Sequence, residues 1–522
     1  MIQLIDRTPA ERATGDGDSP TNTCPRLSIV VPLFNDRGCA VASVESWVHQ
    51  SAPAEQYQIV VIGDGRRRLE DRVRRLLRPG DRFVPCDTTN EAVIYNVGAE
   101  VSTAPLLVLT ESHAIPERDV AESVLRYFRE HDVESATLAS FHGAPNRVAA
   151  VDGSVQKYES PSMTSLGRWR TVSLRGFAIR REAFFRFGKF DVDCLRFAET
   201  TLAVRLQRAG CEIGHVGDAA IQHVDVSNLR QMARDLRSGT YGECAFRDRE
   251  GATADAMMGP MPQWSERGAF SRPLARQLVR NMIESTWRDF GRKGWLRKVR
   301  ASSRLVAEYA AVATLGHWGA AAMTKLEAHL RGLSFYVRLA LRPGRSERRI
   351  RRMNKYFHAV RVAWVRVGVV DYLRGRRFPA APYLDPKRET PLAAINDDFL
   401  AGFYASETWR GELCRWTEPA AAMRFSMAAR SGRFLLRLRT YGSLADRCLR
   451  VLFNRYVVPL RAMRLEGDRL EFDVPADAFR SGDQILSLTC APCDPGGWGA
   501  TDYRSLGVAI SSIRFERHAS AQ

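Results

Sequence analysis

The sequence predicts an α/β domain with a mostly parallel sheet between helices, followed by a helical region and a C-terminal β-sandwich. Apolar runs of strand length at 27–32, 58–65 and 105–113 each precede a helical stretch. Between 228 and 377 the apolar period is helical, and beyond 391 it becomes two, which predicts short strands at 434–440, 470–474 and 484–489. Continuous apolar strands alternating with amphipathic helices are typical of parallel sheets covered on both faces, whereas a period of two indicates half-buried antiparallel strands.

A chain of 522 residues is too long for a single core, so we expect several structural units. These units are a disordered tail at 1–23, the α/β domain at 24–235, a helical region at 236–378, a proline-rich linker at 379–391 and a jelly-roll-like β-sandwich at 392–522. The tail contains no apolar core of signal-peptide length, which indicates a cytoplasmic protein.

The net charge of +18 indicates a partner that carries negative charge, such as a phosphate-bearing ligand, nucleic acid or anionic lipid. No zinc-finger pattern or aromatic RNA-binding motif accompanies the charge, so we expect no specific nucleic-acid partner. The segment 306–323 approaches the length of a membrane span. It contains Glu308 and His317, which favour a buried or interfacial helix.

The segment 348–367 predicts a basic amphipathic helix. Its apolar residues follow a 3-4-3-4-3 spacing and form one stripe, made of Ile350, Met353, Phe357, Val360, Trp364 and Val367. Arginines flank the stripe. The helix either lies in an anionic membrane interface at the inner face of the membrane or packs on the first domain with a solvated basic face.

Polar side chains follow the predicted strands of the first domain at Asn35, Asp36, Asp64, Glu111 and His113. Ligands of parallel sheets bind at the carboxyl ends of strands, so these residues predict the site. Alternate residues of an extended segment project to one side, which lets Glu111 and His113 share a metal ion. Mg²⁺ favours the oxygen donor and Mn²⁺ accepts both ligands; the alternative is a solvated polar turn.

Eight segments occur in the order seen in family 2 glycosyltransferases of the GT-A fold, and the resemblance covers about the first 230 residues. They are 27–36, 46–50, 60–65, 96–98, 109–116, 175–180, 188–191 and 199–210. The C-terminal part resembles β-sandwich modules appended to bacterial glycan-assembly transferases. Its aromatic residues Tyr404, Trp409, Trp416 and Trp498 either stack on sugars or pack in the core.

The resemblance implies roles for individual residues. Glu199 falls at the position of the catalytic base; the alternative is a helix N-terminal carboxylate stabilised by the dipole. Glu111 and His113 fall on the family's Asp-x-Asp metal motif, and His223 is either a third metal ligand, a phosphate donor or a structural histidine. The implied nucleotide-sugar-binding residues are Pro32, Asn35, Asp36, Asp64, Asn96, Arg175 and Gly176. Gly63 replaces the first of the two aspartates that the family usually carries there.

The function that the resemblance implies is inverting transfer of a sugar to a hydroxyl of a glycan or lipid-linked glycan in surface polysaccharide assembly. The donor is a nucleotide sugar, with UDP favoured, and Mn²⁺ or Mg²⁺ is the cofactor. The alternative is a glycan- or nucleotide-binding protein without catalysis, because Gly63, the Glu111 and His113 pair and Glu199 all depart from the family's aspartates.

Overall fold

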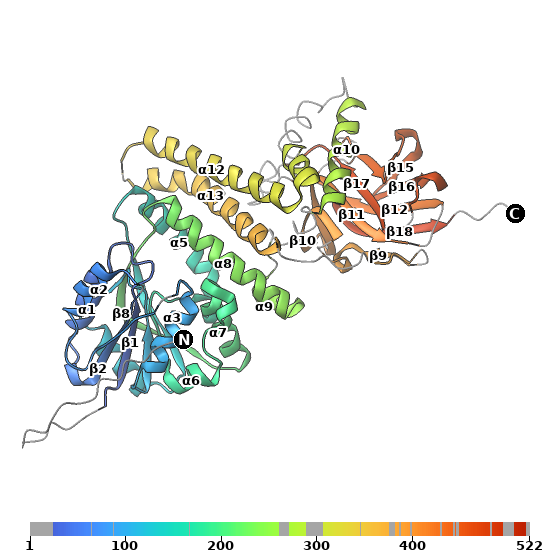
Figure 1. Ribbon diagram of the computed structural model, residues 1–522. Coiled ribbons are helices and arrows are strands. Elements are labelled where there is room, and N and C mark those ends of the chain that lie inside the picture. Colours follow the sequence, from blue (N-terminus) through green and yellow to red (C-terminus); the bar gives the residue numbers. More distant parts are fainter. Residues whose placement is uncertain are drawn as a thin grey trace, which may run out of the picture.

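The computed structural model shows an α/β domain and an antiparallel β-domain joined by a layer of long helices (Figure 1). It describes residues 24–517 except 64, 87, 166, 260, 262–270, 289–305, 345, 375–381, 386–387, 397–398, 428–430, 442–443, 445–447, 481–482 and 494–505. The predicted tail at 1–23 and Asp64 therefore lie outside the described residues.

The first domain is built on an eight-stranded mixed sheet with the strand order β3-β2-β1-β4-β7-β6-β8-β5. The strands are β1 (Leu27–Pro32), β2 (Tyr57–Ile62), β3 (Arg82–Val84), β4 (Leu106–Leu109), β5 (Ala114–Pro116), β6 (Ser135–Gly143), β7 (Phe177–Arg180) and β8 (Ile213–Val224). β1, β2, β3 and β4 pair in parallel, as predicted. β7 runs antiparallel to β4 and β6, and β5 runs antiparallel to β8, so the sheet as a whole is mixed.

Helices cover both faces of this sheet. They are α1 (Ala40–Val48), α2 (Arg67–Arg74), α3 (Glu91–Val101), α4 (Val120–Glu130), α5 (Arg147–Ser165), α6 (Arg181–Arg186) and α7 (Ala198–Arg208). In β1, Ile29 joins the core that includes Trp47 of α1, while Val30 joins the core that includes Tyr95 of α3. This double burial explains why the strand sequences are apolar without alternation. A Cβ atom at Gly98 would lie 2.3 Å from Val30 Cγ1, so glycine permits the close approach of α3.

The helices that follow the first domain include α8 (Leu229–Glu250), α9 (Ala252–Met258), α10 (Arg272–Arg288), α12 (His317–Leu341) and α13 (Glu347–Leu373). The apolar stripe predicted for 350–367 lies on α13 and is buried in a core shared with α5, α8 and α12. The packing alternative is therefore correct, and the stripe itself is not available to a membrane.

The segment predicted as one helix over 306–323 is divided at Gly316, whose φ of 61° ends one helix before α12 begins. Glu308 is buried and its carboxylate accepts a 2.6 Å hydrogen bond from Arg366. Within the described ranges, no helix has both the length and the apolar character needed to cross a bilayer.

The C-terminal part is a ten-stranded antiparallel sheet, in which β9 and β10 branch off the path β14-β13-β17-β11-β18-β12-β16-β15. The strands are β9 (Thr390–Pro391), β10 (Leu400–Trp409), β11 (Glu412–Ser426), β12 (Gly432–Arg439), β13 (Arg450–Phe453), β14 (Tyr456–Val457), β15 (Met463–Glu466), β16 (Arg469–Val474), β17 (Asp483–Thr489) and β18 (Ala509–Arg517). The strands predicted at 434–440, 470–474 and 484–489 correspond to β12, β16 and β17. The division into two packed sheets stays a prediction.

The β-domain shares a core with the helical layer. Leu278 of α10, Val370 of α13 and Ile485 of β17 belong to one buried cluster, and Asn281 Nδ2 donates a 3.0 Å hydrogen bond to Ser487 Oγ. Trp416 is fully buried and stacks on Tyr441 at 5.2 Å between ring centroids, so core packing is its role. Trp498 lies outside the described residues.

Candidate active site

Glu111, His113 and His223 meet at the carboxyl end of β4. The strand stops at Leu109, and the residues after it form a turn closed by the Ala114 N–H and the Glu111 carbonyl at 3.0 Å. Glu111 Oε2 lies 3.2 Å from His113 Nε2 and 3.4 Å from His223 Nε2. The prediction that Glu111 and His113 lie together is confirmed, but a turn joins them rather than an extended segment. The pairing of β5 with β8, Ala114 opposite His223, supplies the third residue.

These three side chains fit a divalent metal ion. Their donor atoms all lie within 4.8 Å of one another. His113 is 1% exposed, and neither of its ring nitrogens makes a well-formed hydrogen bond to any described residue. Burial lowers the pKa of His113 to about 4, so the imidazole is neutral and able to ligate at neutral pH. A donor set of two imidazoles and one carboxylate suits Mn²⁺ better than Mg²⁺.

Glu111 is an ionised carboxylate in this cluster. Burial acts to raise its pKa, but the imidazoles of His113 and His223 and the guanidinium of Arg196 outweigh burial and hold the pKa well below its ordinary value. A second carboxylate, that of Asp225, contacts His223 and His142. Asp225 is fully buried, and its Oδ1 lies 3.2 Å from His223 Nδ1 and 3.1 Å from His142 Nδ1. Asp225 therefore holds His223 with Nε2 turned toward Glu111.

Glu199 lies in the first turn of α7, in the same cavity as Glu111 and His223. Its Oε2 accepts a 2.8 Å hydrogen bond from the Leu174 N–H, which fixes the carboxylate. Burial, followed by the charge of Glu111, raises the pKa of Glu199 to about 7. A carboxylate with this pKa can accept a proton at neutral pH far better than an ordinary glutamate. Helix-dipole stabilisation would lower its pKa, so the dipole does not dominate here.

Arg196 is a central residue that the sequence did not reveal. Its guanidinium lies 2.8 Å from Glu111, 2.9 Å from Asp235 and 3.4 Å from Glu91. It follows Leu195, whose φ of 46° reverses the chain just before α7. Asp235 comes from α8, beyond the region that carries most of the predicted residues. No local pattern marks either residue, because only the folded chain brings α8 over the strand ends.

The loop after β1 is tied to α8. Asn35 Nδ2 donates to Asp235 Oδ1 at 3.3 Å, and Arg37 forms a 3.1 Å ion pair with Asp235. Asp36 pairs with Arg66 at 2.8 Å, and Pro32 is the buried last residue of β1. A Cβ atom at the neighbouring Gly63 would lie 2.4 Å from Glu70 Oε1 and 2.9 Å from Phe83 Cζ, so a side chain there would require Glu70 and Phe83 to shift.

Three other predicted residues lie further along the chain. Asn96 is buried in α3; its amide donates to the Phe190 carbonyl at 2.9 Å and accepts from the Phe190 N–H at 3.0 Å. Both hydrogen bonds serve the fold of that segment. Arg175 lines the cavity of Glu199 and donates to Gln156. Gly176 lines the adjoining cavity, where a Cβ atom would lie 2.8 Å from Ile221 Cδ1.

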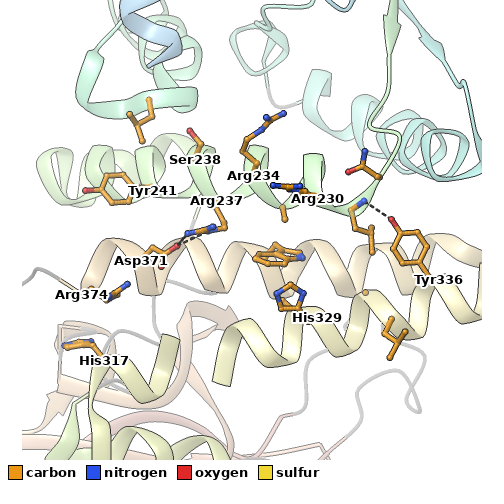
Figure 2. Close-up of a pocket in the computed structure, with 18 of the residues that line it drawn as sticks. Arg230, Arg234, Arg237, Ser238, Tyr241, His317, His329, Tyr336, Asp371 and Arg374 are labelled. Carbon is orange, nitrogen blue, oxygen red and sulfur yellow. Dashed lines mark hydrogen bonds and ion pairs between the residues drawn. The ribbon is translucent and has the colours of Figure 1, made fainter. Parts of the chain in front are cut away.

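Three cavities lie along α7 and α8. The first, of about 510 Å³, holds Glu111, His223, Arg196 and Glu199. The second, of about 780 Å³, shares Glu199 and Arg175 with the first. The third, of about 1350 Å³, lies on the opposite side of α8, with α12 as its far wall and α13 as its floor (Figure 2). Glu199 thus stands on the wall between two cavities, each large enough for part of a substrate.

Comparisons with known proteins find that the chain is similar to glycosyltransferases, although no protein-family profile matches it. Over 185 residues the chain is 20% identical to a dolichyl N-acetyl-alpha-D-glucosaminyl phosphate 3-beta-D-2,3-diacetamido-2,3-dideoxy-beta-D-glucuronosyltransferase of Methanococcus voltae. The match covers 33% of this chain and 55% of that enzyme. The chain thus spans about half the length of the curated relative it matches.

Solved glycosyltransferase structures also match over much of the chain. The mannosyltransferase PcManGT from Pyrobaculum calidifontis, in complex with GDP-Man and Mn²⁺, has a TM-score of 0.37 and 15% identity, covering 69% of this chain and 90% of its own. TarS of S. aureus has a TM-score of 0.32 and 14% identity, covering 74% of this chain and 96% of its own. The curated M. voltae relative is a glycosyltransferase, the class that the resemblance implies, whereas membership of family 2 and the GT-A fold stay predictions.

Proposed function

We propose that the chain is an inverting glycosyltransferase that moves a sugar from a nucleotide-sugar donor to a hydroxyl of a glycan acceptor. One observation carries the proposal: Glu199, with a pKa of about 7, lies on the wall shared by the cavity of the Glu111 cluster and a second, larger cavity. A base between two cavities can face a donor on one side and an acceptor on the other.

The proposed reaction is a single displacement. The acceptor oxygen attacks the anomeric carbon while its proton moves to Glu199, and the bond from the anomeric carbon to the diphosphate oxygen breaks. The electron pair of that bond leaves with the diphosphate. Because attack and departure take place on opposite faces, the anomeric configuration inverts.

The donor binds at the carboxyl ends of the parallel strands in this proposal. Asn35, Asp36 and Asp64 hold the base and ribose, and the guanidinium groups of Arg37, Arg175 and Arg196 face the phosphates. Glu111, His113 and His223 would hold a divalent ion, which when bound supplies positive charge to the departing diphosphate. Pro32, Asn96 and Gly176 complete the proposed binding residues through the backbone they shape.

The finer assignment follows the resemblance to family 2 transferases. We infer that the domain at 24–235 has the GT-A fold, that UDP-sugars are the favoured donors and that the product belongs to a surface polysaccharide. The M. voltae relative, named for a dolichyl N-acetylglucosaminyl phosphate, supports a lipid-linked acceptor. A cytoplasmic enzyme at the inner face of the membrane would meet such an acceptor, and the C-terminal β-sandwich would be a glycan-assembly module.

The testing experiment measures transfer and donor binding across UDP-, GDP- and dTDP-sugars, with Mn²⁺, with Mg²⁺ and with chelator. We expect one donor to be selected, stronger activity with Mn²⁺, and a product of inverted configuration by NMR. Retention of configuration would contradict the single displacement.

The alternative is a binding protein without turnover, motivated by the glycine at position 63, where the family usually carries an aspartate. Under this alternative a donor binds, yet no sugar is transferred or hydrolysed under any metal condition, and Glu199→Gln changes nothing. Loss of turnover in Glu199→Gln with donor binding intact would instead support the enzyme.

A further inference from the structure

The outer face of α12 is apolar and exposed. Its side chains are between 48% and 75% exposed and form one stripe along the helix: Trp318, Leu326, Leu330, Leu333, Val337 and Leu341. In the part of the chain that the structure describes, seven of the sixteen exposed large apolar side chains belong to this one helix. Monomeric proteins rarely leave so continuous an apolar surface in water.

The opposite face of α12 already has its partner. Ala321, Ala328 and Phe335 are buried, and the helix packs along α13 at the outer edge of the helical layer (Figure 1). The stripe is therefore not a core face left open by a missing neighbour within that layer. Spacings of four, three and four residues keep Leu326, Leu330, Leu333 and Val337 on one side. Arg331 and Arg338 fall outside the stripe.

Cationic groups border the stripe at one end and along one side. At the end, the turn from α12 to α13 carries exposed Arg342, and the first two turns of α13 carry exposed Arg348, Arg349 and Arg352. Along the side, Trp318 and Leu333 also line the third cavity, whose opposite wall carries Arg230 and Arg237 of α8 (Figure 2). An apolar stripe bordered by arginines matches the interface of an anionic bilayer, where acyl chains lie next to phosphates.

We propose that the outer face of α12 docks on an anionic lipid bilayer. The leucines lie among the acyl chains, and the arginines at the junction of α12 with α13 and in the third cavity lie at the lipid phosphates. A bilayer accounts for both the apolar stripe and the arginines beside it, whereas a second copy of the chain accounts for the stripe alone. The docking does not depend on catalysis. It therefore stands or falls separately from the proposed transferase activity.

The test is co-sedimentation of the full chain with vesicles of phosphatidylcholine alone or mixed with phosphatidylglycerol. We expect binding to the anionic vesicles, weakened by salt. The combined variant Leu326→Ser, Leu330→Ser and Leu333→Ser should lower the bound fraction about tenfold or more. All three side chains are exposed, so folding should be retained. The matched control, Leu413→Ser with Leu465→Ser, removes exposed leucines from the β-domain and should bind normally.

Two further measurements test whether this face of α12 contacts the lipid and whether the neighbouring arginines contribute to binding. Brominated lipids should quench part of the tryptophan emission of the wild type, and Trp318→Phe should abolish that part. Arg348→Gln with Arg349→Gln and Arg352→Gln should weaken binding to anionic vesicles only. The proposal is overturned if the wild type binds neither vesicle, if the leucine variant binds equally well, or if the wild type forms a dimer that this variant abolishes while vesicles are ignored.

Discussion

The cavity at the strand ends and the core of the C-terminal sheet are buried to the same degree but differ in chemistry. His113 is 1% exposed, and Asp225, Phe434 and Phe425 are each 0% exposed. In the β-domain core, burial removes apolar surface from water and stabilises the fold. In the cavity, burial raises the pKa of Glu199 and leaves ring nitrogens of His113 without good hydrogen bonds, which opposes stability. Burial thus costs free energy in the candidate site and supplies it in the aromatic core.

The largest expected effect comes from Glu199→Gln. Loss of the base should lower the rate of transfer about 100- to 10,000-fold while the donor dissociation constant stays unchanged. Steady-state kinetics and calorimetric titration of the donor measure the two quantities. Glu182→Gln, an exposed glutamate of α6, is the matched control and should behave as wild type. Equal activity of the Glu199 variant would remove this residue from the reaction.

Phe434→Ala should produce the opposite result. Phe434 is fully buried, with ring centroids 4.8 Å from Phe515 and 5.5 Å from Phe472, so truncation should lower the free energy of unfolding by about 3–5 kcal/mol. Denaturant titration measures the loss, and donor binding by the folded protein should persist. Leu465→Ala, a half-exposed control in β15, should change stability little. A large loss of donor affinity in the folded Phe434 variant would contradict the separation of roles between the two regions.

Asp225→Asn tests the positioning of His223. Because Asp225 accepts from His223 Nδ1, its replacement should weaken Mn²⁺ binding about 10- to 100-fold, as measured by calorimetry without donor. Asp132→Asn changes an exposed aspartate and should leave the affinity unaltered. Unchanged Mn²⁺ affinity in the Asp225 variant would exclude His223 as an oriented ligand.

The smallest expected effect is the pH dependence of turnover. A carboxyl whose pKa is raised to about 7 is protonated below that pH, so Glu199 acts as a base only above it. Its ionised fraction, and with it the rate, should rise about tenfold between about pH 6 and about pH 8. Rates of sugar transfer measured at saturating donor concentration report this rise with pH. The residual activity of Glu199→Gln should lack it, and a wild-type rate that is flat across this range would contradict the raised pKa.

Much of the fold and part of the site could be predicted from short-range patterns. Apolar strand runs and the period of two located β1, β2, β4, β12, β16 and β17 because burial on one or two faces leaves its mark on neighbouring residues. The polar residues after β4 were recognisable because strand ends line up at one edge of a sheet. Glu199 was recognisable from its resemblance to a family pattern, and its cavity and its pKa of about 7 emerged only in the folded chain.

What the tertiary structure alone decided is how distant segments meet. The apolar stripe of α13 and that of α12 read alike in the sequence, yet the first is core and the second is exposed, because helix packing can bury only the face that finds a neighbour. Arg196 and Asp235 join Glu111 only after α8 folds over the strand ends. Periodicity reports that a face is apolar; the chain's path in three dimensions determines what, if anything, covers it.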